Sequence, residues 1–131
     1  MIQQESILHV ADNSGAKTVK CIKVLGGYKK KTAKPGELII TSVQELRNKS
    51  KITSKVKKGD ILKALIIRTK KSQKKKDGTT TFSFKRTKNQ NAVILINNKG
   101  NPVGTRITEP ILFKLKKKQF LKFINISPGI I

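Results

Sequence analysis

The sequence contains few of the residues that covalent or metal cross-links require. Its 131 residues include one cysteine, Cys21, and one histidine, His9. A single cysteine excludes an intramolecular disulfide, and one Cys with one His cannot supply the four ligands of a structural zinc site. Disulfide-rich and zinc-stabilised scaffolds are therefore excluded.

Acidic residues are also scarce, and the seven that occur are dispersed along the chain. A two-metal nuclease needs several carboxylates that converge on one point, and no clustered pair is present. His9 has no Ser or Asp motif beside it that would make it a general base, and no GxxxxGK[ST] or GxGxxG loop occurs. Cys21 fits a small buried hydrophobe better than an activated thiolate. We expect no enzymatic activity and no metal or other cofactor.

Long apolar segments are missing as well. Apolar runs such as Ala64–Ile67 are far shorter than the ~18 to 20 residues that span a bilayer. The first residues, Met1–Glu5, lack the pattern of a secretory signal or an organellar presequence. We expect a protein that is not integral to a membrane and that acts in the compartment where it is made.

Positive charge is what the chain has in excess. It carries 30 Lys or Arg against 7 Asp or Glu, a net charge of +23, which is about one uncompensated charge per six residues. Self-repulsion of this size opposes compaction and predicts a polyanionic partner. The cations concentrate in three clusters, at Lys29–Lys31, at Arg68–Lys76, and at Lys114 with Lys116–Lys118.

The residue types in these clusters indicate how the partner is bound. Lysine acts as a point charge that suits many phosphate positions, so we expect contacts mainly to a nucleic-acid backbone. About six such contacts predict a slope of log K against log salt of roughly −4 to −5. With one Tyr and no Trp, few residues are available to stack on bases, although Phe82 and Phe84 could do so if they do not pack in the core. Backbone and shape recognition of structured RNA fits best.

Short β-branched runs separated by turn residues predict a small closed barrel or a sandwich. In Thr18–Leu25 the apolar alternation slips after Cys21, which predicts a β-bulge. Ala64–Ile67 is apolar on both faces, as in a central strand that is covered on both sides. Residues 33–40 and 56–63 share a basic, Gly, acid, aliphatic order, which turn chemistry explains more simply than duplication. The expected strands are Ser6–Val10, Thr18–Leu25, Glu37–Val43, Asp60–Thr69, Thr79–Phe84 and Ala92–Ile96.

The pattern changes after Thr108, where apolar residues recur at helical spacing. Pro110 can occupy a first helical turn, so we expect a short helix near Ile111–Lys117. A second helical turn or two should follow from Phe120 and end at Ser127-Pro128-Gly129. We therefore expect one domain over residues 1–131, with a barrel and basic hairpin in 1–107 and a short helical segment in 108–131.

Several ordered segments together resemble the universal large-ribosomal-subunit protein fourteen family. The resemblance covers nearly the whole chain and rests on Met1-Ile2-Gln3, Val10–Lys17, Lys23–Gly27, Lys58-Gly59-Asp60, Lys63–Lys71, Asp77-Gly78, Asn91–Asn97 and Gly104–Ile107. Two departures from the family pattern stand out. Ser83 occupies a usual aromatic position, and Thr108-Glu109-Pro110 replaces the usual Phe-Gly before the proline.

The resemblance implies a mainly β fold, a five-stranded barrel with a projecting hairpin and two short C-terminal helices. It also implies a non-catalytic role on large-subunit rRNA at the face that meets the small subunit. The implied partners are a neighbouring large-subunit protein of the protein-nineteen type, small-subunit rRNA in an intersubunit bridge, and a ribosome-silencing factor. With the lysine clusters added, the predicted RNA contacts are Asn13, Ser14, Lys17, Lys29, Lys30, Lys31, Arg68, Lys70, Lys71, Lys74, Lys75, Lys76 and Arg106.

Heavy use of Lys, Ile and Asn is typical of an AT-rich genome, and the chain starts at the family's mature position. Both facts favour an organelle-encoded protein of the mitochondrial matrix, with a plastid or a bacterial cytoplasm as alternatives. Two other functions stay open. A basic architectural DNA-binding barrel would bind duplex DNA as well as rRNA, and a peripheral membrane protein would use residues 111–126 as a basic amphipathic helix.

Overall fold

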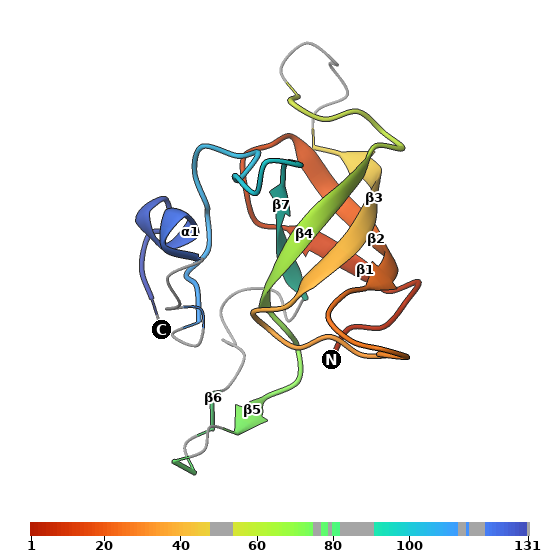
Figure 1. Cartoon of the computed structure of the whole chain (residues 1–131). Coiled ribbons are helices and arrows are strands. Elements are labelled where there is room, and N and C mark those ends of the chain that lie inside the picture. Colours follow the sequence, from red (N-terminus) through yellow and green to blue (C-terminus); the bar gives the residue numbers. More distant parts are fainter. Residues whose placement is uncertain are drawn as a thin grey trace.

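The computed structural model describes residues 1–47, 54–74, 77–78, 80–81, 91–112, 115 and 120–130. Five strands form a closed barrel in the order β1-β2-β3-β4-β7 (Figure 1). Neighbours pair antiparallel, except that β1 closes the barrel by pairing in parallel with β7. The mainly β fold and the five-stranded barrel are therefore confirmed. The strands are β1 (Ile7–Val10), β2 (Ala16–Val24), β3 (Leu38–Leu46), β4 (Ile61–Arg68) and β7 (Ala92–Ile96).

The predicted bulge in β2 is present. The register of β2 against β3 shifts between Cys21 and Lys23. Cys21 and Val24 are buried, whereas Ile22 between them is 41% exposed. Because side chains alternate strictly in a regular strand, two interior residues three positions apart require one extra residue, and the bulge provides it.

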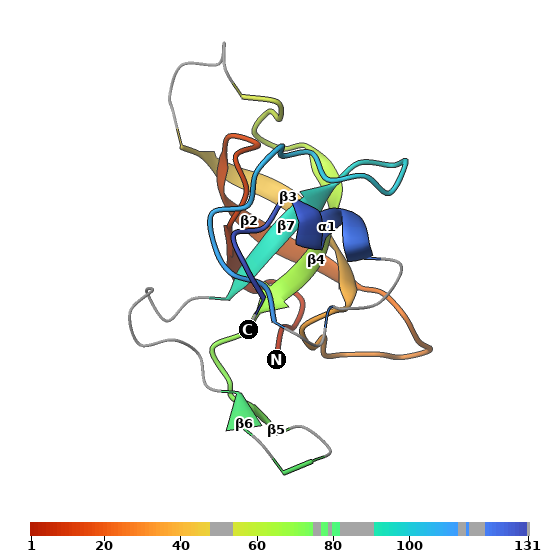
Figure 2. The same ribbon diagram turned by 90° about the vertical axis from the view of Figure 1, so that its left-hand side faces the viewer.

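The expectation for β4 is also confirmed, since its two faces join two separate apolar clusters. Ala64 and Ile66 belong to the cluster inside the barrel. Leu65 and Ile67 belong to a second cluster that includes Phe123. In Figure 2 the helix α1 (Leu121–Asn125) lies across β7 and β4, which places this second cluster under the C-terminal segment. Each fully buried Leu or Ile contributes about 1.5 to 3 kcal/mol of transfer free energy.

The C-terminal segment differs in part from the expectation. Ile111 is not helical: it forms a parallel bridge with Ile130, and its N–H donates to the Gly129 carbonyl at 3.0 Å. Its side chain is buried in the cluster outside β4, so the residue lies flat against the barrel. Leu115 lies in a 3-10 turn, while most of residues 113–119 are outside the described residues. The helical turn expected after Phe120 is α1, and the Ser127 hydroxyl ends it by donating to the Ile124 carbonyl at 2.7 Å.

The projecting hairpin is formed by two short antiparallel strands, β5 (Gln73–Lys74) and β6 (Thr80–Thr81). Figure 1 shows it extending away from the barrel beyond the end of β4. Of the strand expected over Thr79–Phe84, the structure describes only Thr80 and Thr81. Phe82 and Phe84 lie outside the described residues, so their stacking on bases stays a prediction.

The sequence pattern shared by residues 33–40 and 56–63 corresponds to the same type of turn in both places. The Lys34 N–H donates to the Glu37 carboxylate at 2.8 Å, and the Lys57 N–H donates to the Asp60 carboxylate at 2.8 Å. In both turns the glycine before the acid has a φ near +90°, at Gly36 and Gly59, a conformation that glycine adopts without strain. Shared turn chemistry accounts for the repeat.

Candidate nucleic-acid interface

The barrel divides the predicted RNA contacts between its two ends. The Asn13 end consists of the described parts of two strand connections, residues 11–15 and 54–60, and of residues 97–106, which follow β7; all lie at the top of Figure 1. The lysine end consists of residues 1–6, 25–37 and 69–74 together with the described remainder of the hairpin, at the bottom of Figure 1. The sequence-predicted site is therefore two separate surfaces.

At the Asn13 end, a buried aspartate holds the first turn in place. Asp12 is fully buried, and its two carboxylate oxygens accept from the N–H groups of Ser14 and Leu95, both at 2.9 Å. These charge-assisted bonds fasten the turn to β7. The Ser14 side chain is fully buried beneath this turn. Contact between Ser14 and RNA stays a prediction, and the burial of its side chain argues against it.

Asn13 fastens the same turn to the loop that carries Arg106. Its side-chain oxygen accepts from the N–H groups of Thr105 at 2.8 Å and Arg106 at 3.1 Å, and its amide donates to the Thr105 hydroxyl at 2.8 Å. At Gly104 an added Cβ would lie 2.8 Å from the Asp12 Cβ, so only glycine allows this approach. The exposed Arg106 side chain thus extends from a rigid backbone.

Lys17 is exposed and already paired. Its ammonium lies 3.1 Å from the Glu45 carboxylate across β2 and β3, and both side chains are more than half exposed. Exposed ion pairs of this kind contribute about 0 to 1 kcal/mol, so a phosphate can replace the carboxylate at little loss of stability.

At the lysine end, Arg68 differs from the lysines that follow it in sequence. Its guanidinium lies 2.7 Å from the Glu109 carboxylate, with side-chain exposures of 8% and 16%. The pair ties the last residue of β4 to the segment that leads to α1. Sequence reasoning grouped Arg68 with the hairpin lysines because they are adjacent. Its contact with RNA stays a prediction that this burial disfavours.

The hairpin lysines that the structure describes, Lys70, Lys71 and Lys74, are exposed. The hairpin root is anchored, since the Lys70 N–H donates to the Asn91 side-chain oxygen at 2.8 Å. The pKa of the Met1 amine is lowered, first by partial burial and second by the positive charge of Lys71. Lys71 therefore lies near the start of the chain. Lys75 and Lys76 lie outside the described residues, as do Lys114 and Lys116–Lys118.

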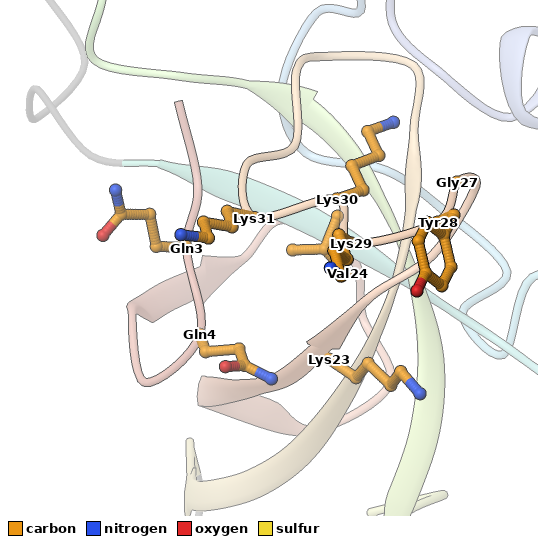
Figure 3. A pocket seen from close by; sticks show the side chains of 9 residues that line it. All are labelled: Gln3, Gln4, Lys23, Val24, Gly27, Tyr28, Lys29, Lys30 and Lys31. Atoms are coloured by element: carbon orange, nitrogen blue, oxygen red, sulfur yellow. The ribbon is translucent and has the colours of Figure 1, made fainter.

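The first lysine cluster lines a pocket of about 630 Å³ between the end of β2 and the N-terminal segment (Figure 3). Lys29 and Lys31 are exposed, whereas Lys30 is held 2.8 Å from Glu37. Although partial burial raises it, the pKa of Glu37 is lowered overall by the Lys30 ammonium and by the Lys34 N–H. Sequence reasoning placed none of the six other lining residues in the site: Gln3, Gln4, Lys23, Val24, Gly27 and Tyr28. The one sequence signal for this pocket is Tyr28, the only tyrosine, which follows two glycines and precedes the lysine cluster.

Uncompensated cations dominate the lysine end. In the part of the chain that the structure describes, its acids are Glu5, Glu37 and Asp77, and the first two pair with Lys20 and Lys30. Such a surface is suited to a polyanion held through its phosphates. The exposed lysines here are Lys29, Lys31, Lys34, Lys70, Lys71 and Lys74.

Two searches of the described residues gave negative results. Over residues 1–47, 54–74 and the later described segments, no group of His, Cys, Asp or Glu side chains is arranged to hold a metal ion. No helix within the described part of the chain is long and apolar enough to cross a membrane.

Comparison with known families identifies a family whose model matches the chain. The family model described as ribosomal protein L14p/L23e matches residues 1–131, the full length of the chain. This is the family that the sequence resembles, and its members are structural and non-enzymatic. The chain therefore belongs to the ribosomal protein L14p/L23e family and is a structural protein of the large ribosomal subunit.

Proposed function

We propose that the chain binds large-subunit rRNA near the face that meets the small subunit, chiefly through its lysine end. The observation that carries this proposal is the group of exposed lysines at one end of the barrel, where Glu5 and Glu37 are already paired with Lys20 and Lys30. Flexible ammonium groups bind phosphates by charge and release counterions, so binding is strong and independent of sequence.

The Asn13 end supplies a second, smaller contact. Arg106 presents a guanidinium on a loop that Asn13 holds by two backbone N–H bonds. A guanidinium forms two parallel bonds to a phosphate, which a lysine cannot do. Lys17 adds a further cation, whose ammonium leaves the Glu45 carboxylate and binds an RNA phosphate instead. Because these two surfaces lie at opposite ends of the barrel, the protein can contact two RNA segments and contribute to an intersubunit bridge with small-subunit rRNA.

The protein partners and the compartment follow from the resemblance. We propose a neighbouring large-subunit protein of the protein-nineteen type and a ribosome-silencing factor as partners, and the mitochondrial matrix as the compartment. A protein partner could also bind the C-terminal segment, because the apolar side chain of Leu121 on α1 is 47% exposed.

The test replaces Lys70, Lys71 and Lys74 with Gln and measures binding to purified large-subunit rRNA between about 50 and 300 mM salt. The slope of log K against log salt should flatten by roughly 2 to 3 units, because three phosphate contacts are lost. The matched control replaces Lys57, Lys58 and Lys99, three exposed lysines of the Asn13 end, with Gln. This control should retain most of the wild-type slope of log K against log salt.

Two outcomes would contradict the proposal. If both triple variants change the slope equally, the lysine end is not the main contact. If the wild-type chain binds duplex DNA as tightly as rRNA and is absent from large subunits, the architectural DNA-binding function is the better description.

A further inference from the structure

The most exposed large apolar side chain in the described part of the molecule is an aromatic ring. Tyr28 is 92% exposed, whereas the next, Ile7, is 68% exposed. Tyrosine is enriched at contact surfaces because its ring buries a large apolar area while its hydroxyl can hydrogen-bond. Tyr28 therefore has an orientation that the folded chain alone does not explain.

The loop that presents Tyr28 is held firmly. Lys30 packs over the preceding glycines, since a Cβ at Gly27 would lie 3.5 Å from the Lys30 Cβ. The Lys30 ammonium is fixed 2.8 Å from Glu37. Beyond the loop, Ile2 and Ala33 exchange two backbone hydrogen bonds, at 2.9 and 2.8 Å. The ring is thus displayed by an ordered loop, which reduces the entropy lost on binding.

The ring shares its pocket with cations and amides. The Lys29 ammonium lies 5.4 Å from the centre of the Tyr28 ring, within cation–π range. Figure 3 shows Tyr28 at one end of the labelled side chains and Gln3 at the other, with Lys29 and Lys31 between them. The pocket volume of about 630 Å³ is typical of a small-ligand site, and its nine lining residues include no acid.

We infer that this pocket binds one unpaired nucleotide of the RNA, with its base stacked on Tyr28 and its phosphate held by Lys29 and Lys31. The inference rests on the proposed function and adds a base-stacking site to it. Stacking on an aromatic ring is tolerant of base identity, and the Gln3 and Gln4 amides can add hydrogen bonds to a base edge. An acidic peptide would use the lysines equally, but it offers no π face to the exposed ring.

The test uses a short single-stranded RNA that contains 2-aminopurine, whose fluorescence falls when the base stacks. Tyr28→Ala should weaken binding roughly 5- to 100-fold and remove the quenching, because stacking on an aromatic side chain is lost. Tyr28→Phe keeps the ring and should bind within about twofold of wild type. Ile7→Ala is the matched control, since it removes an exposed apolar side chain elsewhere and should change neither signal.

Each remaining outcome decides the inference. If Tyr28→Ala binds the RNA and quenches 2-aminopurine as well as wild type does, the inference is overturned. It is also overturned if poly-glutamate binds the wild type and Tyr28→Ala weakens that binding as much as it weakens RNA binding, since that result indicates an acidic protein partner. Unchanged urea unfolding of Tyr28→Ala verifies that the fold is intact. If the wild type fails to bind large-subunit rRNA, the proposed function fails; if it binds and Tyr28→Ala binds that rRNA equally, only the stacking site fails.

Discussion

The two ends of the barrel differ in what their polar side chains contact. At the Asn13 end, the side chains of Asp12 and Asn13 are engaged by five hydrogen bonds within the chain. At the lysine end, Lys29, Lys31 and Lys71 are exposed, and the ring of Tyr28 faces solvent. The polar side chains of the Asn13 end stabilise the fold, whereas those of the lysine end are available to bind a partner.

This contrast has an energetic basis. A buried polar group that loses its partner is costly, so the two hydrogen bonds to the buried Asp12 carboxylate contribute to stability. Exposed lysines repel one another and contribute little to folding, so their accumulation reflects the partner rather than the fold. Mutations at the two ends should therefore separate stability from binding.

The largest effect should come from Arg68, which the sequence groups with the hairpin lysines and the structure pairs with Glu109. Arg68→Met leaves the Glu109 carboxylate buried without its ion-pair partner at the root of the hairpin. The free energy of unfolding should fall by about 3 to 5 kcal/mol, measured by urea denaturation. Lys70→Met, two residues further on and exposed, should change stability by less than about 0.5 kcal/mol.

The double variant Arg68→Met with Glu109→Leu sharpens this test. Removing both charges eliminates the unpaired carboxylate, so most of the lost stability should return. If Arg68→Met alone is as stable as wild type, the pair does not anchor the hairpin, and Arg68 belongs with the RNA-binding lysines after all.

Asp12→Ala should have the next largest effect. It leaves the N–H groups of Ser14 and Leu95 without acceptors inside the protein. Two unsatisfied buried donors should lower the unfolding free energy by about 2 to 5 kcal/mol, measured by urea denaturation. Asp12→Asn retains one acceptor oxygen and should lose less. A loss in Asp12→Ala of under about 0.5 kcal/mol would mean that the turn is not held by this carboxylate.

The fold was predictable where pattern and physics act over short distances. The bulge after Cys21 and the two-sided burial of Ala64–Ile67 follow from side-chain alternation, and both are present. The prediction of a helix that begins near Ile111 was wrong at that residue. The helical spacing of apolar residues contains no information about the hydrogen bond from the Ile111 N–H to the Gly129 carbonyl, which is distant in the sequence. Long-range pairing overrides local propensity at such positions.

The candidate site was predictable in composition and less so in geometry. Lysine clusters give the charge, but they do not distinguish Arg68, which is buried, from Lys71, which is exposed. The burial of Ser14 depends on the turn that Asp12 fastens to β7, and no local pattern encodes that contact. Tyr28 was overlooked because one tyrosine gives no periodicity, and only its exposure in the fold singles it out.

Arg106→Lys tests whether the Asn13 end binds RNA at all, with a smaller effect. The backbone of residue 106 is held by Asn13 and should not move, so stability should stay within about 0.5 kcal/mol. A guanidinium fork becomes a point charge, and binding to large-subunit rRNA should weaken about fivefold, near 1 kcal/mol. Lys99→Gln at the same end serves as a control for charge alone. Equal binding by Arg106→Lys and wild type would confine the RNA to the lysine end.

The smallest effect is a pH dependence that originates in the lysine end itself. The pKa of Glu37 lies below its usual value of 4.5, so below that value the unfolded chain binds this proton more readily than the folded chain. The Lys30–Glu37 contact therefore stabilises the fold above the unfolded pKa, and its contribution is lost as pH falls through the lower folded pKa. The loss should be under about 1 kcal/mol, because the pair is partly exposed.

Glu37→Gln should remove this pH dependence below about pH 5, measured by urea denaturation at fixed salt. Lys30→Gln removes the partner and should flatten the profile in the same range. Because Lys30 also packs over the glycines that carry Tyr28, both variants should loosen the ring and weaken 2-aminopurine quenching at neutral pH. A flattened profile with full quenching would show that Glu37 and Lys30 stabilise the barrel without ordering the Tyr28 loop.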